Sequence, residues 1–391
     1  MKLAIKLAFR NLIGAGLRTW LNVVVLSFSF MLIIAAKGIL VGWDRQAKND
    51  MTAWEIGGGQ YWNNNYDPYD AFTLTDAHSP VPPEFESEVQ NGEMVPVLIT
   101  QGTIYPQGRM QTILIKGIDP HQKLLQLPTS ELDTGSVAIP AIIGSNMARA
   151  NHLDRGDYVT VRWRDKNGTF DAAEIIITGI FTTNVPTVDV GQVWIPLEKL
   201  RSMMMMPGEA TIITFRDSKK PGTDAPDWKL ETFQSLVSGI DEMIKTKSVG
   251  QSIFYSILLI LALLAIFDTQ VLSIFRRQKE IGTYVALGYT RREVVGLFTV
   301  EGAMHAVLAA LVGAVYGIPF LAWLANKGIS LGMSSADYGF AIADTMYPVY
   351  SAGLVAGTIL LVLLATTLVS YWPSRRIAKM NPTEALRGKL Q

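Results

Sequence analysis

Cysteine is absent from this sequence of 391 residues, and histidine occurs only four times. The lack of cysteine excludes disulfides, thiolate metal sites and cysteine nucleophiles. Charged residues make up only 17% of the chain, and 34 basic residues balance 34 acidic ones, so nucleic acid is not expected as a partner. A G-x-x-x-x-G-K-[ST] sequence is also missing, so the chain has no phosphate-binding loop of that type.

Long apolar runs dominate what the sequence does contain. Hydrophobic residues make up 49% of the chain, which is typical of a membrane protein with a substantial soluble part. The first run contains 22 residues and would form a helix about 33 Å long, enough to cross the hydrocarbon core of a bilayer. Four transmembrane helices are predicted, at Trp20–Val41, Ser252–Ser273, about Val295–Leu324 and about Val349–Trp372.

The N-terminal segment can be interpreted in two ways. Met1–Arg18 mixes basic and apolar residues as an amphipathic helix on the cytoplasmic leaflet would. The apolar run that follows is either a membrane helix or the core of a signal peptide. We favour the membrane helix, because the run is long, begins late and lacks a small-residue cleavage site before Trp43.

Between the first two apolar runs the composition becomes soluble, with Gly, Pro, Asn and Asp interrupting short apolar segments. Alternating apolar residues predict a hairpin of Tyr158–Arg164 and Ala172–Phe181 with a type I′ turn at Asn167-Gly168. A mixed α+β domain is therefore expected here. Its further strands are predicted at Val95–Ile99, Thr112–Gly117, Gln192–Ile195 and Thr211–Phe215, and its helices at Ile142–Ala150 and Pro196–Met204, the latter with proline at its first position.

Apolar residues at helical spacing over Asp227–Lys247 lead without proline into the second apolar run, which predicts one long helix. The fold class expected is thus an α-helical membrane protein with four transmembrane helices and a large α+β domain inserted between helices 1 and 2. The predicted domains are residues 1–43, with the amphipathic helix and first span, residues 44–247, with the inserted domain, and residues 248–391, with helices 2 to 4 and the tail.

Basic residues are concentrated in a short segment between the second and third spans. Phe275–Glu293 contains five Lys or Arg residues, the tail after Trp372 contains five more, and the loop Asn326–Pro348 contains one. Because an excess of Lys and Arg in short loops marks the cytoplasmic side, both termini are expected in the cytoplasm and residues 44–247 outside it. Within the basic segment, Ile281, Val285 and Leu287 form an apolar face at helical spacing, as a docking helix would.

Two stretches of this sequence resemble a known family. RRQKEIGTYVALGYTRREVVGLFTVEG, residues 276–302, and PSRRIAKMNPTEALRG, residues 373–388, are similar to segments of the FtsX-like permeases of ABC transporters. That family includes MacB-type exporters and LolC/LolE-type lipoprotein-releasing permeases. The inserted stretch from GIF to PLEKL, residues 179–200, looks closer to the LolC/LolE type.

The resemblance implies that the basic segment is a coupling helix seated on an ABC ATPase. It also implies a permease in the bacterial inner membrane that lacks enzymatic activity and cofactors of its own, with ATP and Mg²⁺ bound by two partner ATPase subunits. Membrane lipids and a second copy or a sister permease are further expected partners. Carried over by position, the ATPase-contacting residues are Glu280, Ile281, Gly282, Ala286, Leu287, Gly288, Arg291 and Arg292.

The cargo expected from the LolC/LolE-like part is a lipoprotein or another amphipathic molecule, with a periplasmic carrier or a membrane-fusion protein as a further candidate partner. Two alternatives stay open. The chain could be an efflux permease of the MacB type, or a non-transporting FtsX-like scaffold that activates a cell-wall hydrolase or a sensor. A membrane enzyme is the least supported class, because no nucleophile, base and orienting group occur together.

Polar residues inside the predicted spans are candidate functional groups, because charge is costly in a bilayer. Glu301 and His305 lie four residues apart on one helical face, either as a proton relay or metal ligands or, as we favour, as a buried polar pair. Asp268 either meets a partner from Arg276 or the neighbourhood of Glu301, or is a hydrated carboxylate. Met203–Met206 is either an adaptable apolar contact or a buried helix end. No metal site or catalytic residue is predicted.

Overall fold

The computed structural model describes residues 16–135, 137–216, 225–330 and 345–379. The chain divides into two compact units. The helical unit comprises Met1–Trp43, Ile244–Ile329 and Tyr347–Gln391, and the α+β unit comprises Asp44–Met243 and Ser330–Met346. Most of the predicted amphipathic helix Met1–Arg18 lies outside the described residues, as does the end of the predicted family signature after residue 379.

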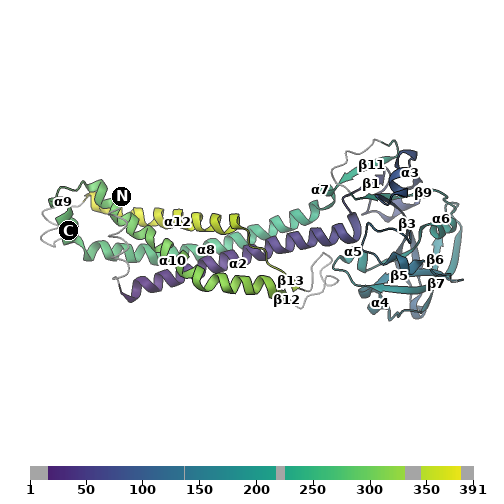
Figure 1. The fold of residues 1–391 in the computed structure, drawn as a ribbon, viewed down its shortest axis with the longest axis horizontal. Helices are drawn as coiled ribbons and strands as arrows, with labels where there is room; N and C mark the ends of the chain where they lie inside the picture. Colours follow the sequence, from purple (N-terminus) through teal and green to yellow (C-terminus); the bar gives the residue numbers. More distant parts are fainter. Residues whose placement is uncertain (1–15, 136, 217–224, 331–344, 380–391) are drawn as a thin grey trace. The chain divides into compact units, whose positions relative to one another are not determined.

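Four helices in the described part of the chain are long and apolar enough to cross a membrane, as predicted. They run side by side in the helical unit (Figure 1). Two of them, the first and the second, continue across the unit boundaries at residues 43 and 244. They are α2 (Leu17–Met51), α8 (Ser238–Arg276), α10 (Arg291–Lys327) and α12 (Ala352–Ser374).

The helices pack around one apolar cluster that draws residues from each of them. Phe30 of α2, Ile266 of α8, Ala309 of α10 and Val362 of α12 are all buried there. Ser351 begins α12, because its hydroxyl accepts a hydrogen bond from the backbone N–H of Leu354 at 3.2 Å. The fourth helix therefore starts at Ala352, three residues later than predicted.

The sequence of α10 contains one GxxxG pair, Gly313 and Gly317, and that of α12 contains another, Gly353 and Gly357, and the two pairs differ in their surroundings. A Cβ atom added at Gly313 would lie 3.5 Å from Ser27, and one at Gly317 would lie 3.7 Å from Met31, so this pair lets α2 and α10 approach closely. A Cβ atom added at Gly353 or Gly357 would meet no described atom within 4 Å.

A nine-stranded mixed sheet forms the centre of the α+β unit, with strand order β11-β1-β10-β3-β4-β8-β5-β7-β6. The last strand of this order, β6, also pairs with β3. The sheet therefore closes into a ring of six strands, β3-β4-β8-β5-β7-β6. The strands of the sheet are β1 (Gly59–Asn63), β3 (Met94–Ile104), β4 (Gln111–Ile118), β5 (Ile139–Gly144), β6 (Tyr158–Arg164), β7 (Phe170–Phe181), β8 (Gln192–Pro196), β10 (Ile212–Phe215) and β11 (Trp228–Thr232).

The other short elements of the chain lie before, between and after these strands, and β12 and β13 pair with each other in the segment between α10 and α12. These short elements are η1 (Thr52–Ile56), η2 (Ala71–Thr75), β2 (Ser79–Pro80), η3 (Pro83–Phe85), α3 (Glu86–Gln90), η4 (Pro106–Gly108), η5 (Thr129–Leu132), α4 (Ser145–Asn151), α5 (Pro186–Asp189), α6 (Leu197–Met204), β9 (Glu209–Ala210), α7 (Phe233–Leu236), β12 (Ile329–Ser330) and β13 (Thr345–Met346). The helical unit adds α9 (Gln278–Ala286) and η6 (Arg375–Lys379).

The predicted hairpin is present, but its turn differs from the prediction. β6 and β7 pair antiparallel, with Arg164 opposite Phe170, so five residues form the loop and the type I′ assignment is wrong. Only Gly168 of the predicted turn has a positive φ, at 84°. Asp165 instead shapes the loop, since its carboxylate accepts hydrogen bonds from the backbone N–H groups of Asn167 at 2.9 Å and Thr169 at 2.8 Å.

Three other local predictions are corrected by the sheet. Ile142–Gly144 is the end of β5, parallel to β7, so the predicted helix begins only at Ser145. Trp228–Thr232 is β11, paired with β1, although its apolar spacing fits a helix. Pro196 caps α6 from outside the helix instead of occupying its first turn. In each case pairing with a neighbouring strand outweighs the local pattern.

Candidate functional site

The basic segment folds as a discrete short helix between two long ones. Arg277 interrupts the helical path at the start of α9, with φ −105° and ψ 24°. Gly288 follows the end of α9 with φ 94°, a conformation that glycine adopts without steric cost. Thr290 then starts α10 through a reciprocal capping box with Glu293. The chain thus bends on both sides of α9, so that α9 is a helix separate from α8 and α10.

The inner face of α9 packs against its own unit. Ile281 is only 2% exposed and joins an apolar cluster with Ile274 of α8, Phe298 of α10 and Ile377 of η6. Gly282 is buried beside it. These two predicted contact residues therefore face the bundle in this chain, and their contact with an ATPase stays a prediction.

The outer face carries the other predicted contact residues. Leu287 is 72% exposed, so an apolar side chain is accessible on this face. The remaining members are polar, small or basic and are also exposed. We call this surface the docking patch, and it consists of Glu280, Ala286, Leu287, Gly288, Arg291 and Arg292.

Arg277 fastens α9 to the bundle. Its Nη1 donates to both carboxylate oxygens of Glu301, at 2.8 and 2.9 Å, and its Nε donates to Glu280 at 2.7 Å. The guanidinium also lies over the ring of Phe298, 4.9 Å from the centroid. Burial alone would lower the pKa of Arg277, but Glu301 and Glu280 raise it above its ordinary value, so the side chain stays charged.

The intramembrane polar residues do not form one cluster. Glu301 pairs with Arg277, while the Nδ1 of His305 lies 3.1 Å from the carbonyl oxygen of Gly302. Asp268 is exposed and makes no ion pair with any described residue. No group of three or more His, Cys, Asp or Glu residues in the described ranges could hold a metal ion. The sequence did not predict that Arg277 pairs with Glu301. The two residues are 24 positions apart, and both α9 and α10 begin between them.

A basic and aromatic cavity of about 940 Å³ lies next to the docking patch. Arg292 of the patch contributes to its wall, together with Arg375, Arg376, Tyr371 and Trp372. Arg375 lies over the ring of Tyr371, 5.8 Å from its centroid. The positive surface at this end of the bundle therefore continues from α10 onto α12 and η6.

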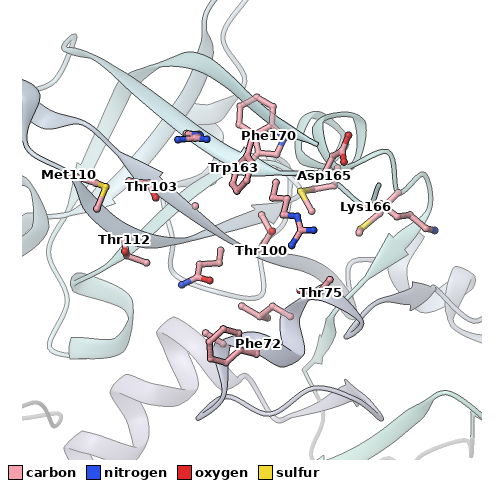
Figure 2. A pocket seen from close by; sticks show the side chains of 18 of the residues that line it. Phe72, Thr75, Thr100, Thr103, Met110, Thr112, Trp163, Asp165, Lys166 and Phe170 are labelled. Atoms are coloured by element: carbon pink, nitrogen blue, oxygen red, sulfur yellow. The ribbon is translucent and has the colours of Figure 1, made fainter. Parts of the chain in front are cut away.

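A second cavity, of about 430 Å³, lies in the α+β unit between η2 and strands β3, β4 and β6. Figure 2 shows Phe72 on one side of it and Trp163 and Phe170 on the other. Met204 and Met206 contribute to its wall and are buried in the main core cluster as well. The Met203–Met206 run thus serves mainly as a buried helix end.

Four apolar helices with an α+β region between the first and the second define a polytopic membrane protein. Residues 252–382 match the family model described as FtsX-like permease C-terminal. This match confirms the predicted resemblance to FtsX-like permeases for this C-terminal part of the chain. It covers α9, the docking patch and the ion pair of Arg277 with Glu301.

Relatives of two types are similar to this chain. An uncharacterized ABC transporter permease of Methanocaldococcus jannaschii is 26% identical over 166 residues, or 42% of this chain and 38% of that protein. The macrolide export ATP-binding/permease protein MacB of Sodalis glossinidius is 25% identical over 236 residues, or 56% of this chain and 33% of MacB. The lipoprotein-releasing system transmembrane protein LolC of Xylella fastidiosa is 21% identical over 308 residues, or 71% of this chain and 74% of LolC.

The matched part of the chain thus spans little more than a third of the length of the first two relatives. The names of the first two relatives describe permeases, and the name of the third describes a transmembrane protein of a lipoprotein-releasing system. The preference for the LolC/LolE type over the MacB type stays a prediction, because relatives of both types are found.

Proposed function

We propose that this chain is the permease subunit of an ABC transporter and converts ATP hydrolysis by two partner ATPase subunits into motion of its α+β unit. The observation that carries the proposal is the two-sided character of α9. One face is locked into the bundle by Ile281, while the other exposes Leu287 among basic residues. A helix of this kind suits a partner with an apolar groove and an acidic rim.

The ion pair between Arg277 and Glu301 would transmit a displacement of the docking patch to α10. A push on α9 would act on Glu301 through two short hydrogen bonds and on Phe298 through direct stacking. It would also act on α8, which ends one residue before Arg277 and extends without interruption for 39 residues. Since helices shift as packed bodies, α8 is the element by which the push would reach the α+β unit.

In this proposal the chain lies in the bacterial inner membrane, with both termini and α9 in the cytoplasm and the α+β unit outside. Support comes from the excess of Lys and Arg in the α9 segment and in the tail. The basic cavity lined by Arg375 and Arg376 would then face the anionic head groups of the inner leaflet. A second copy of the chain or a sister permease would complete the transporter.

The proposed cargo is a lipoprotein or another amphipathic molecule taken from the outer leaflet or from outside the membrane. Inside the predicted spans the ionisable residues are Lys37, Asp268, Glu301 and His305, and Glu301 is already paired. A water-soluble solute would therefore find few polar partners through the bundle. Similarity to LolC supports a lipoprotein, and similarity to MacB supports efflux as the second candidate.

Reconstitution with the partner ATPase tests this proposal. Acylated protein should stimulate ATP hydrolysis and leave the outer leaflet of liposomes for a soluble acceptor, and Glu280→Lys should reduce that stimulation. ATP-driven flux of a water-soluble compound, with no effect of acylated protein, would replace lipoprotein release by efflux. ATP hydrolysis without movement of either substance would instead support a signalling scaffold.

A further inference from the structure

A buried lysine interrupts an otherwise apolar face of the sheet in the α+β unit. Lys116 lies on β4, where Ile113 and Ile115 belong to one core cluster and Leu114 and Ile118 belong to the other. Alternation places Lys116 on the face of Leu114 and Ile118. The side chain is only 5% exposed, which is rare for lysine without an anionic partner.

The ammonium of Lys116 has an aromatic neighbour but no acceptor. Lys116 pairs with Trp194 across β4 and β8, and its Nζ lies 5.0 Å from the centroid of the Trp194 ring. No described residue forms an ion pair or a hydrogen bond with this ammonium. The Nε1 of Trp194 is likewise buried without a hydrogen-bond partner among the described residues. Two buried donors on neighbouring strands thus lack an acceptor, and such groups are normally satisfied.

Both side chains line one cavity of about 630 Å³. That volume is in the range of small-molecule sites. The rest of its wall is mostly apolar and aromatic, and includes Trp62, Val185, Ile212 and Met243. A mostly apolar cavity whose wall includes an unpaired ammonium fits a molecule with an apolar tail and an acceptor head.

The acidic residues of the cavity are already engaged by other donors. Glu55 accepts a hydrogen bond from the hydroxyl of Thr187 at 2.7 Å. Glu231 accepts one from Ser235 at 2.6 Å and pairs with Lys229 at 2.5 Å. Neither carboxylate forms an ion pair with Lys116, although Glu55 lies near enough to influence its charge.

We propose that this cavity binds a single-chain amphiphile with an anionic head, whose head accepts a hydrogen bond from Lys116 and whose chain occupies the apolar part. The head is a carboxylate or a phosphate, since each presents oxygen acceptors with negative charge. Four residues at the beginning of α8 contribute to the wall, namely Ser238, Gly239, Ile240 and Met243, so an occupant contacts the beginning of that helix. The site is independent of the cargo and of the ATPase contact.

The protonation of Lys116 supports the choice of an anion. Burial lowers its pKa from the ordinary value, and the nearby Glu55 only partly opposes this effect. An anionic head would raise the pKa again, so binding favours the protonated amine. Affinity should therefore fall as the pH rises into the alkaline range, where Lys116 loses its proton and decanoate stays ionised.

Binding of decanoate, decyl phosphate and decanol to the full-length purified chain tests the proposal. Titrations are run by calorimetry at one fixed concentration of a nonionic detergent, and the free concentration of each ligand is corrected for its own separately measured partition into the micelles. The anionic ligands should bind saturably, with decanol weaker by about tenfold or more because it lacks the charge. Decanoate binding alone points to a free fatty acid, and decyl phosphate binding alone points to a lipid phosphate.

Lys116→Met removes the ammonium and keeps the length of the side chain, and Lys199→Met removes an exposed lysine of α6 as the control. The first variant should weaken anion binding about tenfold or more, lose the pH dependence and unfold at or above the wild-type temperature. The control should bind as the wild type does. Equal binding of decanol and decanoate, no saturable binding of either anion, or full binding by Lys116→Met would overturn the proposal.

Discussion

The ion pair between Arg277 and Glu301 gives the sharpest quantitative prediction. Both side chains are largely shielded from water, with 18% and 9% of their surfaces exposed. Removing one partner of a buried pair typically costs about 3 to 5 kcal/mol, because the other charge stays buried. Arg277 would keep Glu280 as a partner, so we expect Glu301→Gln to cost about 2 to 4 kcal/mol.

Thermal unfolding of the purified chain in detergent, followed by circular dichroism, measures this effect. Glu280→Gln is the matched control, because Glu280 pairs with the same guanidinium but is 54% exposed, and exposed pairs contribute about 0 to 1 kcal/mol. Glu301→Gln should therefore lower the unfolding temperature clearly more than Glu280→Gln does. Equal unfolding temperatures for the two variants would refute the claim that the ion pair between Arg277 and Glu301 holds α9 against the bundle.

A double substitution separates loss of the pair from loss of a single charge. Arg277→Met combined with Glu301→Leu leaves no unpaired charge, and such apolar replacements are often close to neutral. We expect the double variant to be more stable than Glu301→Gln, yet to couple ATP hydrolysis poorly. A double variant with normal coupling would show that the push does not pass through this pair.

Three further outcomes are expected. In cells, a single cysteine at Asn167 should react with an impermeant thiol reagent from outside, and one at Arg291 only after the inner face is exposed; the reverse pattern would invert the topology. Gly288→Trp should reduce copurification of the ATPase about tenfold, whereas Gly92→Trp, at an equally open positive-φ glycine of the α+β unit, should not. Gly302→Val should destabilise the bundle by about 1 to 3 kcal/mol in a denaturant titration, because its Cβ would collide with α12; unchanged stability would contradict the packing of α10.

The number of membrane-length helices in the helical unit could be predicted from the sequence, because the length and hydropathy of each apolar run determine it. Each of the four apolar runs is long enough to span a bilayer, so their number was predicted correctly. Helix ends were less predictable, since α12 begins where the Ser351 hydroxyl caps it. The exposed and buried faces of α9 also needed the structure, because Ile281 and Leu287 are equally apolar in sequence.

Strand partners account for most errors in the α+β unit. Trp228–Thr232 has helical spacing but pairs with β1, and no local signal records that pairing. Lys116 illustrates the same limit for the cavity. Its strand was predicted, but its neighbours Trp194 and Glu55 come from distant parts of the chain, so its burial without an acceptor was visible only in the folded unit.

Crosslinking within the native complex tests the central claim most directly, namely that the exposed face of α9 docks on the ATPase. A single cysteine at Leu287, which is 72% exposed, would carry a short photoreactive crosslinker, with Leu368 of α12, 69% exposed, as the control position. The proposal predicts crosslinks to the ATPase subunit from position 287 and none from position 368. Efficient labelling at position 287 without any crosslink to the ATPase would contradict it.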